Sequence, residues 1–233
     1  MQFDKEFDAS GLSCPMPIVK TKKSLADMAS GQVLRVVATD PGSVCDMQAF
    51  AEQTGHQLLQ SGQEGGKYVF LLKKAWLDMA AKKMAIIATK GTLDMAYPPL
   101  ILASTASALG WDVQVFFTFY GLQLLRKDLE GIHISPLANP AMPMPPMPVM
   151  VAALPGMEAM ATKMMKSKMK SKGVASLLEL RNVCLESDVK FIACQMTVDL
   201  FEFEKSDFID GIDYGGAATF LKFAGETDVC LFI

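Results

Sequence analysis

Histidines and closely spaced cysteines are scarce in this 233-residue sequence, which holds two histidines, five cysteines and no Cys-x-x-Cys spacing. So few histidines cannot supply the mixed Cys/His ligand sets of common structural zinc sites. An odd cysteine count with no regular spacing gives no case for a disulfide framework. We therefore expect free thiols, a reducing cytoplasm and no metal centre.

Other familiar patterns are missing too. Neither a Gly-x-Gly-x-x-Gly nor a Gly-x-x-x-x-Gly-Lys-Ser/Thr motif occurs, so nucleotide binding has little support. The formal net charge of −3 gives no case for nucleic acid. The first residues lack the basic and apolar regions of a secretory signal. Residues 131–157 carry no Asp, Glu, Lys or Arg, but their prolines exclude a membrane-spanning helix, and we expect extended, partly polyproline-like chain there.

Cys14 is the first candidate for chemistry. It stands in Leu12-Ser13-Cys14-Pro15-Met16-Pro17, between an alternating strand pattern and a helix pattern. Proline is tolerated in the first turn of a helix, so Cys14 is expected at or next to the N-cap. The positive helix end and three nearby lysines favour thiolate, which predicts a pKa below that of free cysteine. These lysines are Lys20, Lys22 and Lys23. The alternative is an inert, buried thiol.

The surrounding motif is longer than this segment. It begins as Asp8-Ala9-Ser10-Gly11-Leu12-Ser13-Cys14-Pro15-Met16-Pro17 and continues through Thr39-Asp40-Pro41-Gly42-Ser43 and Thr54-Gly55-His56. On the basis of this motif, the segment 3–72 resembles the TusA/SirA-like sulfur-carrier family. The resemblance implies that Cys14 carries sulfur as a persulfide.

Residues 1–73 read as a small two-layer α/β sandwich. We expect strands at 3–7, 32–39, 57–60 and 67–72 and helices at 15–29 and 43–54, with Ser43 as an N-cap and Gly55 just past the second helix. Residues 74–82 are the expected linker, with a short helix over 73–82.

From residue 83 the pattern changes to apolar runs at 84–89, 113–119, 189–193 and 229–233. They alternate with expected helices at 94–109, 122–128, 175–187, 198–203 and 216–224. This pattern predicts a doubly wound, Rossmann-like domain over 83–233, with a parallel sheet covered on both faces. A Pro/Met-rich insert is expected at about 136–172.

Such a fold binds at the carboxyl ends of its strands, where three segments should meet. These are Lys90-Gly91-Thr92, Tyr120-Gly121 and Cys194-Gln195. Tight turning explains the two glycines better than phosphate binding. Cys194 follows a buried strand and precedes Thr197, an expected N-cap, so it repeats the setting of Cys14, although a buried core thiol fits its position equally well.

The segment Cys194-Gln195-Met196-Thr197-Val198-Asp199, the Pro/Met-rich insert and a Met/Lys-rich helix come together in residues 83–233. On these features the region resembles the DsrE/DsrF-like family, in the branch that carries the insert. The resemblance implies sulfur transfer through Cys194, no organic cofactor and a homo-oligomer formed through this domain.

The remaining candidates belong to no motif. Cys184 and Cys230 are expected to be structural, whereas Cys45 at a helix start stays open as an accessory thiol. His56 is expected to make a local hydrogen bond. The Met/Lys helix at 157–172 is expected to cover the sheet, with a surface for varied partners or a peripheral membrane contact as alternatives. The acidic stretch 199–213 is expected to pair with the lysines of this helix or with a neighbouring subunit, and it is also the expected counterpart of the lysines near Cys14.

These features predict a sulfur-trafficking protein, a sulfur carrier or sulfurtransferase with Cys14 and Cys194 as its two thiols. Its partners would be sulfur donor and acceptor proteins or small sulfane-sulfur compounds. The rival hypothesis is a thiol-based redox sensor or regulatory binding protein. A membrane-docking module is a third hypothesis and depends on the Met/Lys helix alone.

Overall fold

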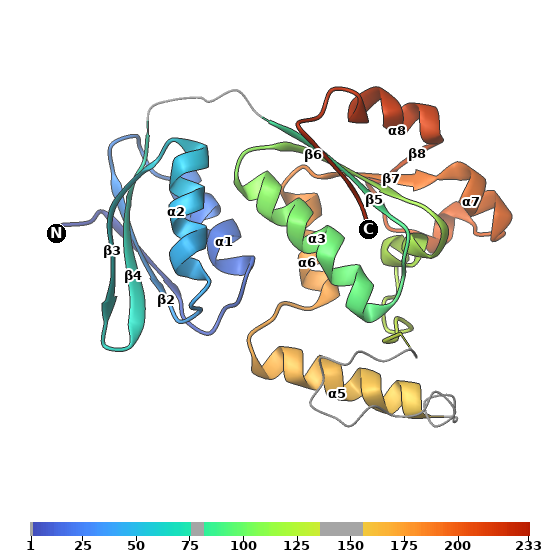
Figure 1. The fold of residues 1–233 in the computed structure, drawn as a ribbon, viewed down its shortest axis with the longest axis horizontal. Coiled ribbons are helices and arrows are strands. Elements are labelled where there is room, and N and C mark those ends of the chain that lie inside the picture. The colour runs from blue at the N-terminus through green and yellow to red at the C-terminus, as the bar shows by residue number, and fades with distance from the viewer. Residues whose placement is uncertain (1, 76–81, 136–155) are drawn as a thin grey trace.

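The computed structural model describes residues 2–75, 82–135 and 156–233, and it forms two units that lie side by side, each built on one sheet (Figure 1). We call residues 2–75 the first unit and the remaining described residues the second unit. The expected helix over 73–82 and the expected extended chain over 131–157 fall largely outside the described residues.

The first unit is the predicted two-layer α/β sandwich. Its elements are β1 (Lys5–Ala9), α1 (Met16–Ala26), β2 (Val33–Ala38), α2 (Ser43–Thr54), β3 (Gln57–Glu64) and β4 (Lys67–Lys73). The sheet has the order β1-β2-β4-β3, and β1 pairs with β2 in parallel while the other pairs are antiparallel. A parallel pair needs a crossover connection, and α1 supplies it.

One face of this sheet is apolar because alternate strand residues share a face. Leu34 and Val36 of β2 and Leu72 of β4 are fully buried beneath Phe50 of α2. The left-handed Gly55 ends α2 as expected. The prediction for the other end is wrong, since Gly42 is the N-cap and Ser43 is a buried first helical residue.

The second unit is the predicted doubly wound fold. Its elements are β5 (Lys83–Ala88), α3 (Leu93–Ala108), β6 (Asp112–Phe117), η1 (Phe119–Leu125), α5 (Met157–Ser171), α6 (Leu177–Glu186), β7 (Lys190–Cys194), α7 (Gln195–Leu200), η2 (Lys205–Asp207), β8 (Asp213–Gly215), α8 (Ala217–Ala224) and β9 (Val229–Phe232). All strands run parallel in the order β8-β7-β6-β5-β9. The helix expected at 122–128 is instead a 3-10 helix that begins at Phe119.

The two faces of this sheet are covered unequally. The larger core lies under α3 and α6, and a smaller cluster lies on the other face under Phe220 of α8. That second face stays open at the edge strand β9, where the side chain of Phe232 is 75% exposed and Cys230 is exposed. The sequence predicted helices on both faces of the sheet. This prediction is correct for the centre of the sheet and wrong for its edge at β9.

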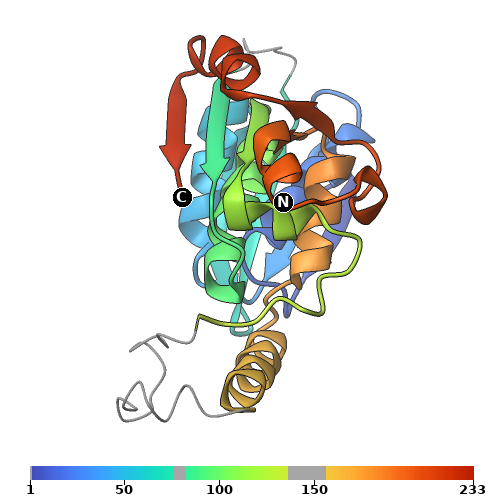
Figure 2. The same ribbon diagram turned by 90° about the vertical axis from the view of Figure 1, so that its right-hand side faces the viewer.

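Helix α5 lies at the rim of the second unit and stands apart from its sheet (Figure 2). Met165 and Met169 pack against the larger core, and the buried hydroxyl of Thr162 accepts a hydrogen bond from the Ile134 N–H. Met160 and Met164 are exposed. The helix thus covers the core only with one face.

The two units meet through α1 and α3. Lys22 Nζ donates a hydrogen bond to the Ser107 carbonyl, and Lys23 lies 3.7 Å from the Glu186 carboxylate. Ala108 of α3 belongs to the core cluster of the first unit, so apolar packing crosses the boundary.

Candidate functional site

The loop that carries Cys14 joins β1 to α1 and is held by the loop that precedes α2. Gly11 adopts φ 79°, and its N–H donates to Thr39 Oγ1 at 2.8 Å. The Cys14 N–H donates to Asp40 Oδ2 at 3.2 Å. Pro15 is the N-cap of α1, so Cys14 stands one residue before the cap and is exposed. The second part of the sequence motif thus holds the cysteine loop in place.

The prediction of a lowered pKa at Cys14 is wrong. Partial burial of the thiol, the negative charge of Asp46, a hydrogen bond between the thiol and Asp46, and the charge of Asp40 together raise the pKa of Cys14 to about 11. Burial also raises the pKa of the Asp46 carboxyl. The resting thiol is therefore protonated at neutral pH, first because it is partly buried and second because Asp46 and Asp40 place negative charge beside it.

The lysines expected to activate Cys14 have other neighbours. Lys22 and Lys23 contact Ser107 and Glu186 of the second unit. Burial lowers the pKa of Lys22. Neither contact involves the acidic stretch 199–213, so the expected pairing of these two lysines with that stretch within one chain is wrong.

The Cys14 loop also contacts the second unit directly. The Ser13 N–H donates to the Gly173 carbonyl at 3.1 Å, and Ser13 Oγ donates to the Lys172 carbonyl at 2.6 Å. Gly173 has φ 70°, and a Cβ there would collide with the Gly11 carbonyl oxygen. Glycine at this position lets the two backbones approach each other closely.

Cys194 ends β7 and is the N-cap of α7. It is 5% exposed, and burial alone would raise its pKa, but hydrogen bonds from Thr197 and Thr118 and from the backbone N–H groups of Thr197 and Met196 lower it. The Thr118 and Thr197 hydroxyls lie 3.0 Å apart. Thr197 is therefore not the expected N-cap. It is instead a buried hydrogen-bond partner that favours the thiolate.

The surface around Cys194 is apolar and exposed. Tyr120 is 65% exposed and packs against Phe201 with ring centroids 5.8 Å apart, and Met196 and Leu200 of α7 are also exposed. An exposed apolar rim beside a nearly buried thiol suits approach by a protein partner.

The ends of β5 and β6 meet as predicted. A Cβ on Gly91 would collide with the Tyr120 carbonyl oxygen, and one on Gly121 would collide with the Ala88 carbonyl oxygen. The Gly121 N–H donates to the Thr89 carbonyl at 3.1 Å. Both glycines therefore allow close backbone packing, as the sequence predicted.

The other three cysteines differ from one another. Cys184 is fully buried, its Sγ donates to the Leu100 carbonyl, and burial raises its pKa to about 12, so it has the expected character of a core residue. Cys45 is exposed near the start of α2. The prediction that Cys230 is structural is wrong because this thiol is exposed on the open face of β9. His56 Nδ1 accepts the Ala75 N–H, the local hydrogen bond that was expected.

The sequence did not identify Asp46 or Thr118 as partners of the two thiols. Thr118 directly follows β6, next to β7 in the sheet, so strand order would have placed it beside Cys194. Asp46 reaches Cys14 only through the packing of α2 against α1, which no local pattern reports.

The elements that carry the two thiols lie far apart. Helix α1 faces α3 on one side of the second unit, whereas α7 lies on the opposite side, and both views agree (Figures 1 and 2). Among the described residues, no helix combines the length and apolar character needed to cross a membrane. That same part of the chain holds no group of three or more His, Cys, Asp or Glu side chains placed to hold a metal ion.

Comparison with known proteins matches both units. Residues 80–232 match the DsrE/DsrF/DrsH-like family, and residues 5–74 match sulfurtransferase TusA. The sulfur carrier protein DsrE2 of Allochromatium vinosum is 64% identical over 160 residues, which cover 66% of this chain and 100% of that protein. The sulfur carrier protein TusA of the same organism is 63% identical over 73 residues, which cover 31% of this chain and 96% of that protein.

A SirA-like protein of Desulfitobacterium hafniense, known from a crystal structure, is 26% identical, with a TM-score of 0.29 over 31% of this chain and 99% of that one. The family match of residues 80–232 spans more than half of the chain, and the TusA match accounts for most of the rest. The chain therefore belongs to the DsrE/DsrF/DrsH-like family and carries, ahead of that region, a segment that matches TusA.

Proposed function

We propose that this protein carries sulfane sulfur as a persulfide on Cys14 and that Cys194 is its second carrier thiol. The relatives named sulfur carrier proteins DsrE2 and TusA support sulfur trafficking. The observation that carries the proposal is the Cys14 loop, which presents an exposed thiol from a backbone fixed by Thr39 and Asp40.

Loading is a thiol exchange. The Cys14 thiolate attacks the outer sulfur of a donor persulfide, the donor S–S bond breaks, and a new S–S bond forms on Cys14. The donor leaves as a thiolate and takes up the proton that Cys14 has lost, so no external oxidant or reductant is consumed. Delivery to an acceptor thiol is the same exchange in reverse.

Asp46 and Asp40 help to keep the Cys14 thiol protonated in the free protein, which lowers its reactivity. A thiol with a pKa of about 11 is mostly protonated at neutral pH and therefore slow to react with unspecific oxidants. A donor protein that draws these carboxylates away from the thiol would raise the thiolate fraction in the docked complex and speed the transfer. Low intrinsic reactivity therefore suits a sulfur carrier that must transfer its sulfur only to specific partner proteins.

Cys194 has the complementary character. Its thiolate is favoured by Thr197 and Thr118, but the thiol is nearly buried. A partner that seats on Tyr120, Met196 and Leu200 would reach it. We propose that sulfur moves between Cys14 and Cys194 of neighbouring subunits, since α1 and α7 lie on opposite sides of the second unit.

The open face at β9 supports the homo-oligomer that such a relay needs. Phe232 and Leu221 are 75% and 63% exposed, and Cys230 lies on the same strand as Phe232. Isolated apolar side chains are common on surfaces, but an edge strand with an adjacent apolar helix face is typical of a contact between protein chains.

We further propose two folding domains, at 1–73 and 83–233, joined by a linker at 74–82, with an insert at about 136–172, and a place of action in the cytoplasm. Separate expression of the two domains tests the boundaries. A peripheral membrane contact through α5 stays a prediction, which co-sedimentation with liposomes tests.

The loading experiment treats the reduced protein with a small-molecule persulfide or polysulfide and maps the products by peptide mass spectrometry. We expect the mass of one added sulfur atom on the peptide that holds Cys14. Cys14→Ser should lose this adduct and keep its fold, because serine suits positions near helix starts. Cys45→Ser, which changes another exposed thiol of the same unit, is the matched control and should load normally.

The rival function as a redox sensor has one observation in its favour, the lowered pKa of Cys194. The same experiment separates the two functions. Sulfenate or disulfide products without any sulfur adduct would support sensing and contradict the carrier role.

A further inference from the structure

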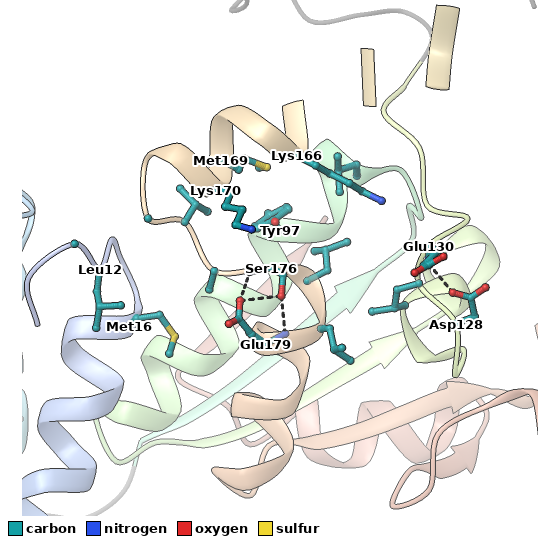
Figure 3. A pocket seen from close by; sticks show the side chains of 18 of the residues that line it. Leu12, Met16, Tyr97, Asp128, Glu130, Lys166, Met169, Lys170, Ser176 and Glu179 are labelled. Atoms are coloured by element: carbon teal, nitrogen blue, oxygen red, sulfur yellow. Dashed lines mark hydrogen bonds between the residues drawn. The ribbon is translucent and has the colours of Figure 1, made fainter. Parts of the chain in front are cut away.

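A cavity of about 980 Å³ opens between the two units (Figure 3). The first unit lines it with the beginning of the Cys14 loop and with α1, and the second unit lines it with α3, residues 127–130, α5 and the segment from Gly173 to the start of α6. This volume lies within the range of sites for small organic molecules.

Much of the wall is apolar. Leu12 and Met16 enter from the first unit, and Tyr97, Met169 and Leu177 enter from the second. Methionine side chains adapt their shape to a flexible apolar ligand. The wall can therefore receive a hydrocarbon chain without a fixed ring shape.

The wall also carries charged residues of both signs, and lysines are the more numerous. It includes the side chains of Lys20, Lys127, Lys166 and Lys170. In the part of the chain that the structure describes, none of the four forms an ion pair within 4.0 Å. Figure 3 shows the Lys170 side chain extending from α5 toward Tyr97.

The carboxylates in the wall are Asp128, Glu130 and Glu179, and two of them are engaged locally. Glu179 accepts hydrogen bonds from the Ser176 N–H and hydroxyl, which lower its pKa, and the charge of Lys20 lowers it further. Asp128 Oδ1 accepts the Glu130 N–H at 2.7 Å. Because the wall holds four lysines and three carboxylates, its formal charge is positive, and a bound anion would neutralise it.

We propose that this cavity binds a small amphipathic carboxylate, with an unbranched acyl chain on the apolar wall and the carboxylate among the lysines. Lysine suits this head group because it is a point charge on a flexible stem and can follow ligands of different length. The site involves neither Cys14 nor Cys194 and is therefore independent of the sulfur-carrier proposal. Because both units line the cavity, an occupant also bridges them.

The test is calorimetric titration of the full-length protein with decanoate, hexanoate and decanol. We expect decanoate to bind, and each two methylenes removed to weaken binding by about tenfold, because burying one methylene contributes about 0.8 kcal/mol. Decanol, which has the same chain and no charge, should bind at least about fivefold more weakly than decanoate.

Variants show whether the binding is at this cavity. Lys20→Met and Lys170→Met keep the aliphatic stem and remove the charge, and the double variant should weaken decanoate binding by about tenfold or more. Lys163→Met, on the exposed side of the same helix α5, is the matched control and should bind as the wild type does. Thermal unfolding of each variant checks that the fold is kept. Equal binding of decanoate and decanol, or unchanged binding by a folded double variant, would overturn the proposal.

Discussion

Replacing Asp46 by asparagine should make the Cys14 thiol react faster. In the native protein the pKa of Cys14 is about 11, so about one molecule in a thousand holds a thiolate at pH 8. Asp46→Asn removes the negative charge beside the thiol and replaces an oxygen that accepts the thiol proton. Partial burial and Asp40 remain, so we expect the pKa to fall by about one and not to reach the value of free cysteine.

The assay is the rate of Cys14 alkylation by iodoacetamide between pH 7 and pH 11, followed by peptide mass spectrometry. The wild-type rate should rise about tenfold with each pH unit up to about pH 10, because only the thiolate reacts. At pH 8 the Asp46→Asn rate should be about tenfold higher than the wild-type rate.

Glu52→Gln is the matched control, because Glu52 is an exposed carboxylate of the same helix whose hydrogen bond is to Gln48. It should leave the rate unchanged. An Asp46→Asn rate equal to or below the wild-type rate would show that Asp46 does not hold the thiol protonated, and a wild-type profile that levels off near pH 8 would show that the pKa of Cys14 is not raised.

Three further predictions concern other parts of the structure. Thr118→Val should raise the pKa of Cys194 and slow its alkylation at pH 7 by about threefold, since one hydrogen bond to the thiolate is lost. Cys184→Ala should lower the free energy of unfolding in urea by about 1 to 2 kcal/mol without affecting sulfur loading. Folding raises the pKa of Cys184 to about 12. The protonated thiol therefore contributes its full amount to the free energy of unfolding below about pH 8.5, and this contribution falls as the pH rises toward 12. The free energy of unfolding of the variant should accordingly decrease less steeply over this alkaline range. Gly173→Ala should push the Gly11 loop away, which small-angle X-ray scattering would detect as a larger radius of gyration.

Local patterns predicted the architecture well. The apolar runs at 84–89 and 113–119 became β5 and β6, and the prolines around Cys14 marked the start of α1. These features depend on the side-chain period and on helix-start chemistry, which a single sequence contains.

The charged neighbours of the thiols were harder to predict from the sequence. The lysines of α1 are near Cys14 in the chain but contact the second unit, whereas Asp46 is remote in the chain and beside the thiol in space. The exposure of Cys230 likewise depends on the place of β9 at the sheet edge, which the apolar sequence of that strand does not reveal.

The most direct measurement loads the reduced full-length protein from a persulfide donor with a heavy sulfur isotope in its outer position and then locates the label. We expect labelled sulfur on the Cys14 peptide of the wild-type protein and none on the corresponding peptide of Cys14→Ser. An added acceptor thiol should take up the labelled sulfur from Cys14. Labelling that persists in Cys14→Ser at the wild-type level, or no label on any cysteine of the wild-type protein, would contradict the claim that Cys14 carries the sulfur.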